Sequence, residues 1–185
     1  MENFLNFFIE IGKLKGNPRR GWVLRGVKNP ESIAEHIFRT ALMSWILGSE
    51  KKLNTERLLK MALIHDICEV YVGDSVPYDV KKIPKSKKAR LAFFKSIPRL
   101  SKAEKEKLAK LKYKKEKKAL DVLTKNLSPK LGSEIINLWL DFEKGLTPEG
   151  RFFKQADRLE TLMQALEYRK KYKNFPYHTF LLRTK

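Results

Sequence analysis

Residues 58–72 read LLKMALIHDICEVYV, an almost wholly apolar stretch interrupted by only a few polar side chains. Such a stretch, preceded by Asn54 and Thr55 as candidate helix caps, predicts a helix that is buried on all sides. Gly73 follows directly, and glycine is a common residue just past a helix end. The sequence therefore predicts a central buried helix that begins after Asn54 or Thr55 and ends at Gly73.

Helical periodicity continues on both sides of this helix, without the alternation and hairpin turns that paired strands would show. Residues 17–30 and 74–84 are punctuated by Pro or Gly and are predicted to be irregular. Gly48 predicts the end of the helix before the central one. Further helices are predicted over residues 2–14, 31–48, 85–97, 101–125, 129–144 and from Pro148 onward.

The composition fits one globular domain. The chain has 185 residues, of which 42% are hydrophobic, enough to bury a core. No linker or repeat divides it, so we expect one all-α domain over residues 1–185, with a core of residues 30–170. The single cysteine, Cys68, excludes a disulfide framework or a Cys-rich zinc module and fits a reducing compartment such as the cytoplasm.

Two further classes are excluded by the pattern of apolar residues. No apolar run approaches the roughly 18–20 residues that a membrane-spanning helix needs. Residues 1–13 carry Glu2 and Glu10 and lack the basic region of a secretory signal, so we expect no signal peptide.

The charge is strongly positive and unevenly distributed. The net charge is +19, and residues 81–118 hold 17 Lys and Arg against three Glu. This Lys-rich segment has few aromatic residues between its lysines and no nucleic-acid recognition motif, which is typical of a solvated helix face. It would attract polyanions in a salt-dependent way, but we expect no specific nucleic-acid binding.

Polar side chains inside apolar helices are the best candidates for chemistry, because burying them unpaired is costly. His65 and Asp66 lie side by side in the most apolar helix. His36 accompanies the apolar stripe of the helix before it, and Asp157 lies at helical spacing between Phe153 and Thr161. Each position alone is also typical of a paired core or surface residue. Together, two imidazoles and two carboxylates from three helices suit a divalent cation.

Two more acids lie near this group in the sequence. Glu69 follows His65 by four residues and is expected on the same helix face, and Asp74 follows directly after the helix end. So many acids at one place require a cation or raised pKa values. Cys68 lies within the buried helix, where a role in packing is expected.

These residues carry a family resemblance. The pattern His36, then His65-Asp66, then Asp157 resembles the H…HD…D signature of the HD superfamily of metal-dependent phosphohydrolases. The stretches GWVLRGVKNPESIAEHIFRTALMS, ALIHDICEVYVGDSVP and FFKQADRLETLMQALEY resemble its 5′-deoxynucleotidase family. The resemblance covers roughly residues 1–170 and implies a helical bundle with a metal site between its helices.

The resemblance also implies roles for individual residues. His36, His65, Asp66 and Asp157 match the metal ligands. Glu69 matches the acid that activates the attacking water, and Asp74 matches a second acid near the phosphate. In some members these two acids help to hold further cations.

The loop before the second helix matches the part of the family that contacts the substrate. Arg25 matches an arginine that faces the phosphate, with Arg20 as the alternative, and Trp22 matches an aromatic residue near the sugar or base.

The resemblance implies an enzyme that removes the 5′-phosphate from deoxyribonucleoside monophosphates and forms a homodimer. Mn²⁺, Co²⁺, Fe²⁺ or Ni²⁺ suits the mixed donor set better than Zn²⁺ or Mg²⁺. Two alternatives remain open from the sequence. One is a related hydrolase of dNTPs, cyclic nucleotides or guanosine polyphosphates. The other is a basic nucleic-acid-binding module that keeps the scaffold.

Overall fold

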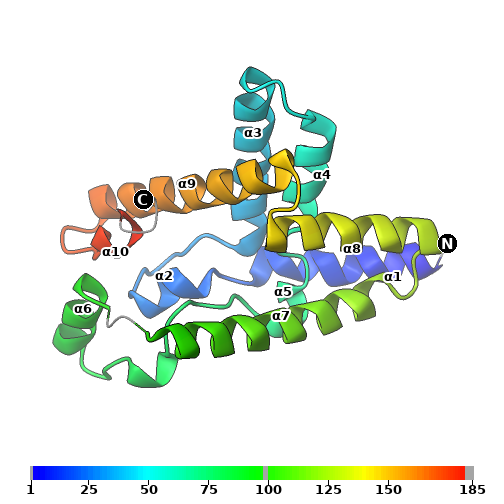
Figure 1. Ribbon diagram of the computed structural model, residues 1–185. Coiled ribbons are helices and arrows are strands. Elements are labelled where there is room, and N and C mark those ends of the chain that lie inside the picture. Colours follow the sequence, from blue (N-terminus) through cyan, green and yellow to red (C-terminus); the bar gives the residue numbers. More distant parts are fainter. Residues whose placement is uncertain (1, 98–99, 182–185) are drawn as a thin grey trace.

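The computed structural model describes residues 2–97 and 100–181, and in these ranges the chain is built from helices and loops (Figure 1). This confirms the predicted all-α class. The only β-type pairing in the described ranges is an isolated bridge between Pro18 and Ser32. The elements are α1 (Glu2–Gly12), η1 (Lys13–Gly16), α2 (Arg20–Leu24), α3 (Ile33–Glu50), α4 (Thr55–Ile64), α5 (Glu69–Val72), η2 (Val80–Lys82), α6 (Lys87–Lys95), α7 (Lys102–Thr124), α8 (Pro129–Lys144), α9 (Pro148–Lys171) and α10 (His178–Leu181).

The centre of the fold is the packing of α3, α4, α8 and α9. Leu58 and Met61 of α4 are fully buried against Phe153 of α9 and Phe142 of α8. A second apolar cluster joins η1, α3, α7 and α8, with Trp139 completely buried in it. None of the described helices is long and apolar enough to cross a membrane.

The central helix differs from its prediction in one important way. We expected one continuous helix up to Gly73, but α4 ends at Ile64 and α5 begins only at Glu69. Between them the backbone N–H of Ile67 donates to the carbonyl of Ile64, and that of Glu69 donates to Asp66. These hydrogen bonds span three residues, so the chain tightens into a turn at the polar residues.

Gly48 does not end the second helix, contrary to its prediction. It lies within α3, which continues to Glu50, and a Cβ built on it would overlap Cδ1 of Leu58. Its missing side chain therefore lets α3 and α4 approach each other closely. Residues 17–30, predicted to be irregular, contain the short helix α2.

Helix α3 begins where the sequence contains a capping box. The Ser32 hydroxyl accepts a hydrogen bond from the Glu35 N–H, and the Glu35 carboxylate accepts one from the Ser32 N–H. This reciprocal cap fixes the start of the helix that carries His36. Likewise Thr147 caps α9, with Pro148 in its first turn as predicted.

Candidate metal centre and adjoining cavity

Four side chains from three parts of the chain converge beneath α9. His36 comes from α3, His65 and Asp66 come from the turn after α4, and Asp157 comes from α9. His36 Nε2 lies 3.3 Å from His65 Nε2 and 3.1 Å from Asp157 Oδ1, while His65 Nε2 lies 3.2 Å from Asp66 Oδ2. The structure thus brings together the four residues that the sequence nominated as metal ligands.

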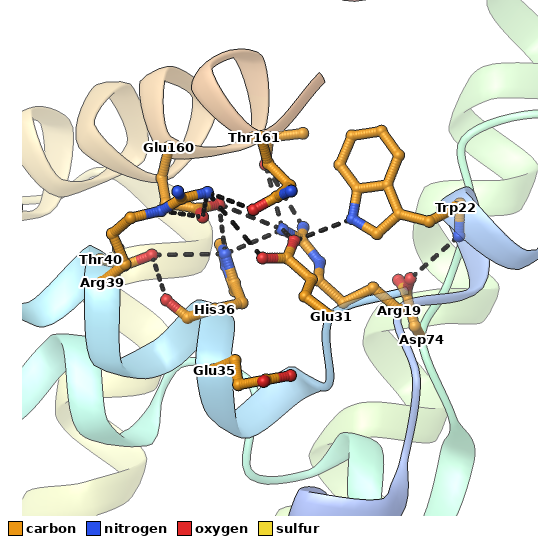
Figure 2. Close-up of polar contacts among 12 residues, drawn as sticks. Arg19, Trp22, Glu31, Glu35, His36, Arg39, Thr40, Asp74, Glu160 and Thr161 are labelled. Carbon is orange, nitrogen blue, oxygen red and sulfur yellow. Dashed lines mark hydrogen bonds and ion pairs between the residues drawn. The ribbon is translucent and has the colours of Figure 1, made fainter. Parts of the chain in front are cut away.

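The hydrogen bonds behind the two histidines indicate where their lone pairs point. His65 Nδ1 donates to the carbonyl oxygen of Ala62 at 2.7 Å, so the proton of its neutral ring lies on that nitrogen. His36 Nδ1 lies 2.5 Å from a carboxylate oxygen of Glu160 (Figure 2). Both Nε2 atoms are thereby directed at each other and at two carboxylates. This arrangement of donors requires a positive charge between them and fits a divalent cation.

The electrostatics of these groups lead to the same conclusion. Burial and Arg19 disfavour a charged His36, but hydrogen bonds to Asp157 and Glu160 outweigh them and raise its pKa to about 9. Burial also disfavours charged Asp66 and Asp157, yet the neighbouring histidines lower both pKa values. Without a metal, a proton on His36 supplies the positive charge that these carboxylates demand.

Glu160 is a central residue of the site that the sequence analysis missed. Its side chain is fully buried, and Arg39 donates to its Oε1 through Nε and Nη2 at 2.9 and 2.7 Å (Figure 2). The sequence contained a signal for it. Glu160 follows Phe153 and Ala156 at spacings of three and four, so a charged residue occupies the buried face of α9.

Glu69 and Asp74 both lie near the group formed by His36, His65, Asp66 and Asp157, which we call the four-residue cluster. Glu69 is buried, and burial together with the charges of Asp66 and Asp74 raises its pKa well above the usual value. Asp74 lines the adjoining cavity, where its Oδ2 accepts a hydrogen bond from the Gly21 N–H at 3.4 Å. The tight turn before α5 therefore keeps Glu69 within the electrostatic field of the cluster.

The three loop residues nominated for substrate contact lie in different surroundings. Trp22 is buried and lines the cavity, and its indole N–H donates to Glu31 at 2.8 Å. Arg25 also lines the cavity, with its guanidinium 4.4 Å from the ring centre of Phe94. Arg20 is exposed and is not among the residues that line the cavity.

Arg19, which the sequence analysis did not single out, is the arginine that contacts His36, on the Nδ1 side of its ring. Its Nη1 lies 2.8 Å from His36 Nδ1 and 3.3 Å from Glu160 Oε2, and both terminal nitrogens lie near the Thr161 hydroxyl (Figure 2). It also lines the cavity. The sequence alone could not distinguish Arg19 from Arg20, because the two residues are adjacent. Their side chains point in different directions only because α2 begins at Arg20.

The cavity beside the four-residue cluster has a volume of about 650 Å³ and lies between α2, α7, α9, α10 and the loop after α5. One part of its wall is aromatic, with Trp22, Tyr78 and Phe180. Its charged side chains are mostly basic. They are Arg19, Arg25, Lys105, Lys112, Lys154 and Arg158, against Asp74 and Asp157. Such a cavity is suited to an anionic ligand that also carries a flat apolar group.

Sequence comparisons identify the family. The profile described as the HD domain matches residues 11–184. The protein named 5′-deoxynucleotidase HDDC2 from Xenopus laevis is 35% identical over 167 residues, which cover 90% of this chain and 70% of that protein. Its namesake from Dictyostelium discoideum is 36% identical over 177 residues, covering 92% and 80%.

Solved structures are similar in fold. A conserved hypothetical protein from Pyrococcus furiosus superposes with a TM-score of 0.63 at 30% identity, covering 91% of this chain and 84% of that one. A predicted metal-dependent phosphohydrolase from Magnetospirillum magnetotacticum gives a TM-score of 0.62 at 26% identity, covering 90% and 72%. Because the HD-domain profile matches residues 11–184 and the fold is all-helical, this chain belongs to the HD-domain family.

Proposed function

We propose that this protein is a 5′-deoxynucleotidase, which hydrolyses deoxyribonucleoside 5′-monophosphates to the nucleoside and inorganic phosphate. The observation that carries the proposal is that Asp157, which lies 3.1 Å from His36 in the four-residue cluster, also lines a cavity with both basic and aromatic walls. The relatives named above, which share about a third of their residues with this chain, bear the name of this activity.

The proposed cofactor is one divalent cation held by His36, His65, Asp66 and Asp157. Two nitrogen and two oxygen donors favour Mn²⁺, Co²⁺, Fe²⁺ or Ni²⁺ over Zn²⁺, which often takes sulfur, and over Mg²⁺, which prefers oxygen. When bound, the cation offsets the charge of the phosphate and makes water a stronger nucleophile. Metal analysis of the purified protein tests this assignment, and two tightly held ions per chain would contradict it.

The protein side chains supply positioning and proton transfer. Arg19 directly precedes α2, contacts His36 and lines the cavity, and it is the proposed contact of the scissile phosphate. Glu69 is the proposed base, because its raised pKa suits a group that takes a proton from water near neutral pH. Asp74, at the cavity wall, is proposed to give a proton to the leaving 5′-oxygen. Trp22 and Phe180 offer apolar surface to the sugar and base.

The sequence nominated Arg25, with Arg20 as the alternative, for the phosphate contact. We propose this contact for neither residue. Arg25 is held between the rings of Phe94 and Phe180, at 4.4 and 4.5 Å, and its proposed part is to shape the cavity wall. Arg20 is exposed and has no proposed contact with the scissile phosphate.

The function is tested by phosphate release from the chelator-stripped protein. dAMP, dCMP, dGMP, dTMP and the ribonucleotides are each supplied with Mn²⁺, Co²⁺ or Mg²⁺. We expect metal-dependent release of phosphate from the deoxy set and weak release from the ribo set. Absence of release from every monophosphate would contradict the proposal. Release of pyrophosphate or tripolyphosphate from dNTPs instead would favour a triphosphohydrolase.

We also propose that the protein forms a homodimer through α3 and α9. These two helices pack together, and each exposes an apolar stripe at spacings of three and four. The exposed residues are Phe38, Leu42 and Trp45 on α3 and Leu159, Met163 and Leu166 on α9. An exposed face of this kind is typical of a self-association surface.

Light scattering tests the homodimer. Trp45→Glu, in the middle of the α3 stripe, is expected to give a monomer, whereas Leu146→Glu, at an exposed site outside α3 and α9, is expected to leave the dimer intact. A wild-type protein of monomeric mass would overturn the proposal.

The proposed compartment is the cytoplasm, because the single cysteine, Cys68, is buried and unpaired, as is usual in a reducing environment. Cell fractionation tests this assignment.

A further inference from the structure

Glu31 is a nearly buried carboxylate that has no part in the chemistry proposed above. It lies in the loop between α2 and α3, and its side chain is only 8% exposed. Its Oε1 atom accepts hydrogen bonds from the Trp22 indole N–H at 2.8 Å and from Arg19 Nη1 at 3.3 Å (Figure 2). One oxygen is therefore joined both to the proposed contact of the scissile phosphate and to a proposed contact of the sugar and base.

The main chain around Glu31 is held on two sides. The carbonyl oxygen of Glu31 accepts a hydrogen bond from the Arg19 N–H at 2.9 Å, and the Glu31 N–H donates to the Tyr168 hydroxyl of α9 at 2.8 Å. The isolated β-bridge between Pro18 and Ser32 lies beside these contacts. Because the backbone is fixed to α9 and to the segment before α2, the fold itself sets the position of the Glu31 carboxylate.

The two side chains held by Glu31 line the same cavity and lead to different parts of the site. Arg19 continues to His36 Nδ1 at 2.8 Å, whereas the Trp22 ring packs on Phe180 with 4.9 Å between the ring centres. Both side chains have rotatable bonds, and a shared acceptor restricts both of them. Glu31 therefore fixes the spacing between the four-residue cluster and the aromatic part of the wall.

The two donors do not depend on Glu31 equally. Arg19 has further acceptors in Glu160, at 3.3 Å, and in the Thr161 hydroxyl. Among the described residues, Glu31 is the one hydrogen-bond acceptor of the Trp22 indole N–H. Loss of the Glu31 carboxylate should therefore leave Arg19 largely in place and release Trp22, so the effect should fall on the nucleoside end of a substrate.

We propose that Glu31 is a positioning residue, which holds Trp22 in register with Arg19 and thereby makes the site select a complete nucleotide over a smaller phosphate monoester. This inference rests on the proposed function and adds a specificity determinant to it. Glu31 touches no reacting atom and transfers no proton. Its contribution is that the surface for the nucleoside is already aligned with the phosphate contact, so less ordering accompanies binding.

The experiment compares kcat/KM for dAMP and for glycerol 3-phosphate, with Mn²⁺ present. Both are phosphate esters of a primary alcohol, but glycerol 3-phosphate lacks the deoxyribose ring and the base. We expect Glu31→Ala to lower the ratio of the two values about tenfold, the effect of one lost hydrogen bond to a charged group. Glu31→Gln, whose amide oxygen can still accept from Trp22, should recover part of the ratio. An equal loss for both substrates in Glu31→Ala would indicate a general structural defect and overturn the proposal.

Glu134→Ala is the matched control. Glu134 also accepts a hydrogen bond, from Lys60 at 2.9 Å, but it does not line the cavity. This variant should keep the wild-type ratio of kcat/KM. A fall equal to that of Glu31→Ala would mean that the ratio does not report on Glu31.

A double-mutant cycle tests whether Glu31 acts through Trp22. Trp22→Phe keeps an aromatic ring and removes the indole N–H, so it should also lower the ratio. Because the two single variants break the same hydrogen bond, Glu31→Ala/Trp22→Phe should fall no further than the lower of the two. Additive effects would show that the two side chains act separately and would overturn the proposal.

The indole N–H signals in a nuclear magnetic resonance spectrum report this contact without any turnover. The chain has three tryptophans, and Trp22→Phe assigns the signal of Trp22. In Glu31→Ala the Trp22 signal should move, while the signal of Trp139, which is completely buried in the core, should stay and show that the variant is folded. An unmoved Trp22 signal would contradict the contact.

Binding of dAMP to the metal-free protein, followed by calorimetry, separates this inference from the proposed activity. About tenfold weaker binding to Glu31→Ala than to wild type supports the role of Glu31 even if dAMP is not hydrolysed. A wild-type protein that hydrolyses dAMP, with the same ratio and the same dAMP affinity in Glu31→Ala, would overturn the role of Glu31 and leave the proposed function standing. A wild-type protein that neither binds nor hydrolyses dAMP would overturn both.

Discussion

The Glu160 carboxylate holds the His36 imidazole at its Nδ1, with 2.5 Å between the two heavy atoms. The pair fixes which ring nitrogen points at Asp157 and Asp66. Acceptors behind a metal-binding histidine typically raise metal affinity about 10- to 100-fold. We therefore expect Glu160→Gln to weaken cation binding by that factor, as measured by competition with a chelator.

Glu167 provides the matched control for this prediction. It also accepts a hydrogen bond from Arg39, at 2.8 Å, but its side chain is half exposed and does not touch His36. Glu167→Gln should retain wild-type cation affinity. Equal affinities for Glu160→Gln and wild type would show that the carboxylate charge does not tune His36.

Truncation of Asp66 and truncation of Glu69 are expected to have different effects on metal retention and turnover. Asp66→Ala removes a donor from the cluster, so both retained metal and turnover should be lost. Glu69→Ala should retain the metal but lose turnover by about 10²- to 10⁴-fold, the usual contribution of a positioned base. Metal content and phosphate release measured on the same preparations distinguish the two, and a near-normal rate for Glu69→Ala would remove this residue from the mechanism.

Glu116 should make stability depend on pH. Burial of its side chain outweighs the attraction of Lys112 and raises its pKa from 4.5 to about 7. Between these pH values the folded protein binds a proton that the unfolded chain has released, so the contribution of Glu116 to stability is fully present below pH 4.5 and is lost as the pH rises from 4.5 to about 7. Glu116→Gln mimics the protonated form and should lessen this fall by about 1–3 kcal/mol.

The measurement is the free energy of unfolding in urea at pH 5 and pH 8. Glu106→Gln, at an exposed position on the same helix, should change with pH as the wild type does. If Glu116→Gln also follows the wild type between these pH values, the buried carboxyl does not titrate in this range.

Gly150 should tolerate no side chain. A Cβ at this position in the first turn of α9 would lie 2.7 Å from Cγ of Asp141 and 2.8 Å from its main-chain oxygen. Asp141 accepts hydrogen bonds from Thr147 and Arg57 and so joins the start of α9 to α8 and α4. We expect Gly150→Ala to destabilise the protein by about 2–4 kcal/mol through this overlap.

The melting temperature of Gly150→Ala measures this destabilisation, and Gly12→Ala is the control. Gly12 has helical backbone angles, and a Cβ there would meet nothing within 4 Å. Its replacement should leave the melting temperature unchanged or raise it slightly, because alanine restricts the unfolded chain. A Gly150→Ala protein that melts with the wild type would mean that Asp141 moves aside at no cost.

The sequence predicted the helices well because their signals are local. Apolar spacing, Pro148 and the caps act within a few residues, and the elements from α6 to α9 agree with their predictions to within a few residues. Gly48 failed as a helix terminator because its role depends on Leu58 of another helix. The break after Ile64 was missed because apolar residues continue through it, and composition does not distinguish hydrogen bonds over three residues from those over four.

The candidate site divides in the same way. Its His and Asp residues were nominated because polar groups in apolar helices are conspicuous in sequence, and the structure brings those four together. Their role as metal ligands remains a prediction. The choice among Arg19, Arg20 and Arg25 depends on the path of the loop around α2, and the basic wall depends on α7 lying across from α9. Neither relationship produces a periodic pattern in the sequence from which it could be predicted.

The bond between His36 and Glu160 joins residues separated by 124 positions in the chain. A nascent chain that has not yet emerged as far as α9 lacks Asp157 and the partner of His36, so the full donor set exists only in the finished molecule. A cation bound by these residues would act as a cross-link between early and late segments. At saturating concentrations, each tenfold increase in free metal should add about 1.4 kcal/mol to the stability of the folded state. Metal supply in the cell would then set the lifetime of this protein as well as its activity.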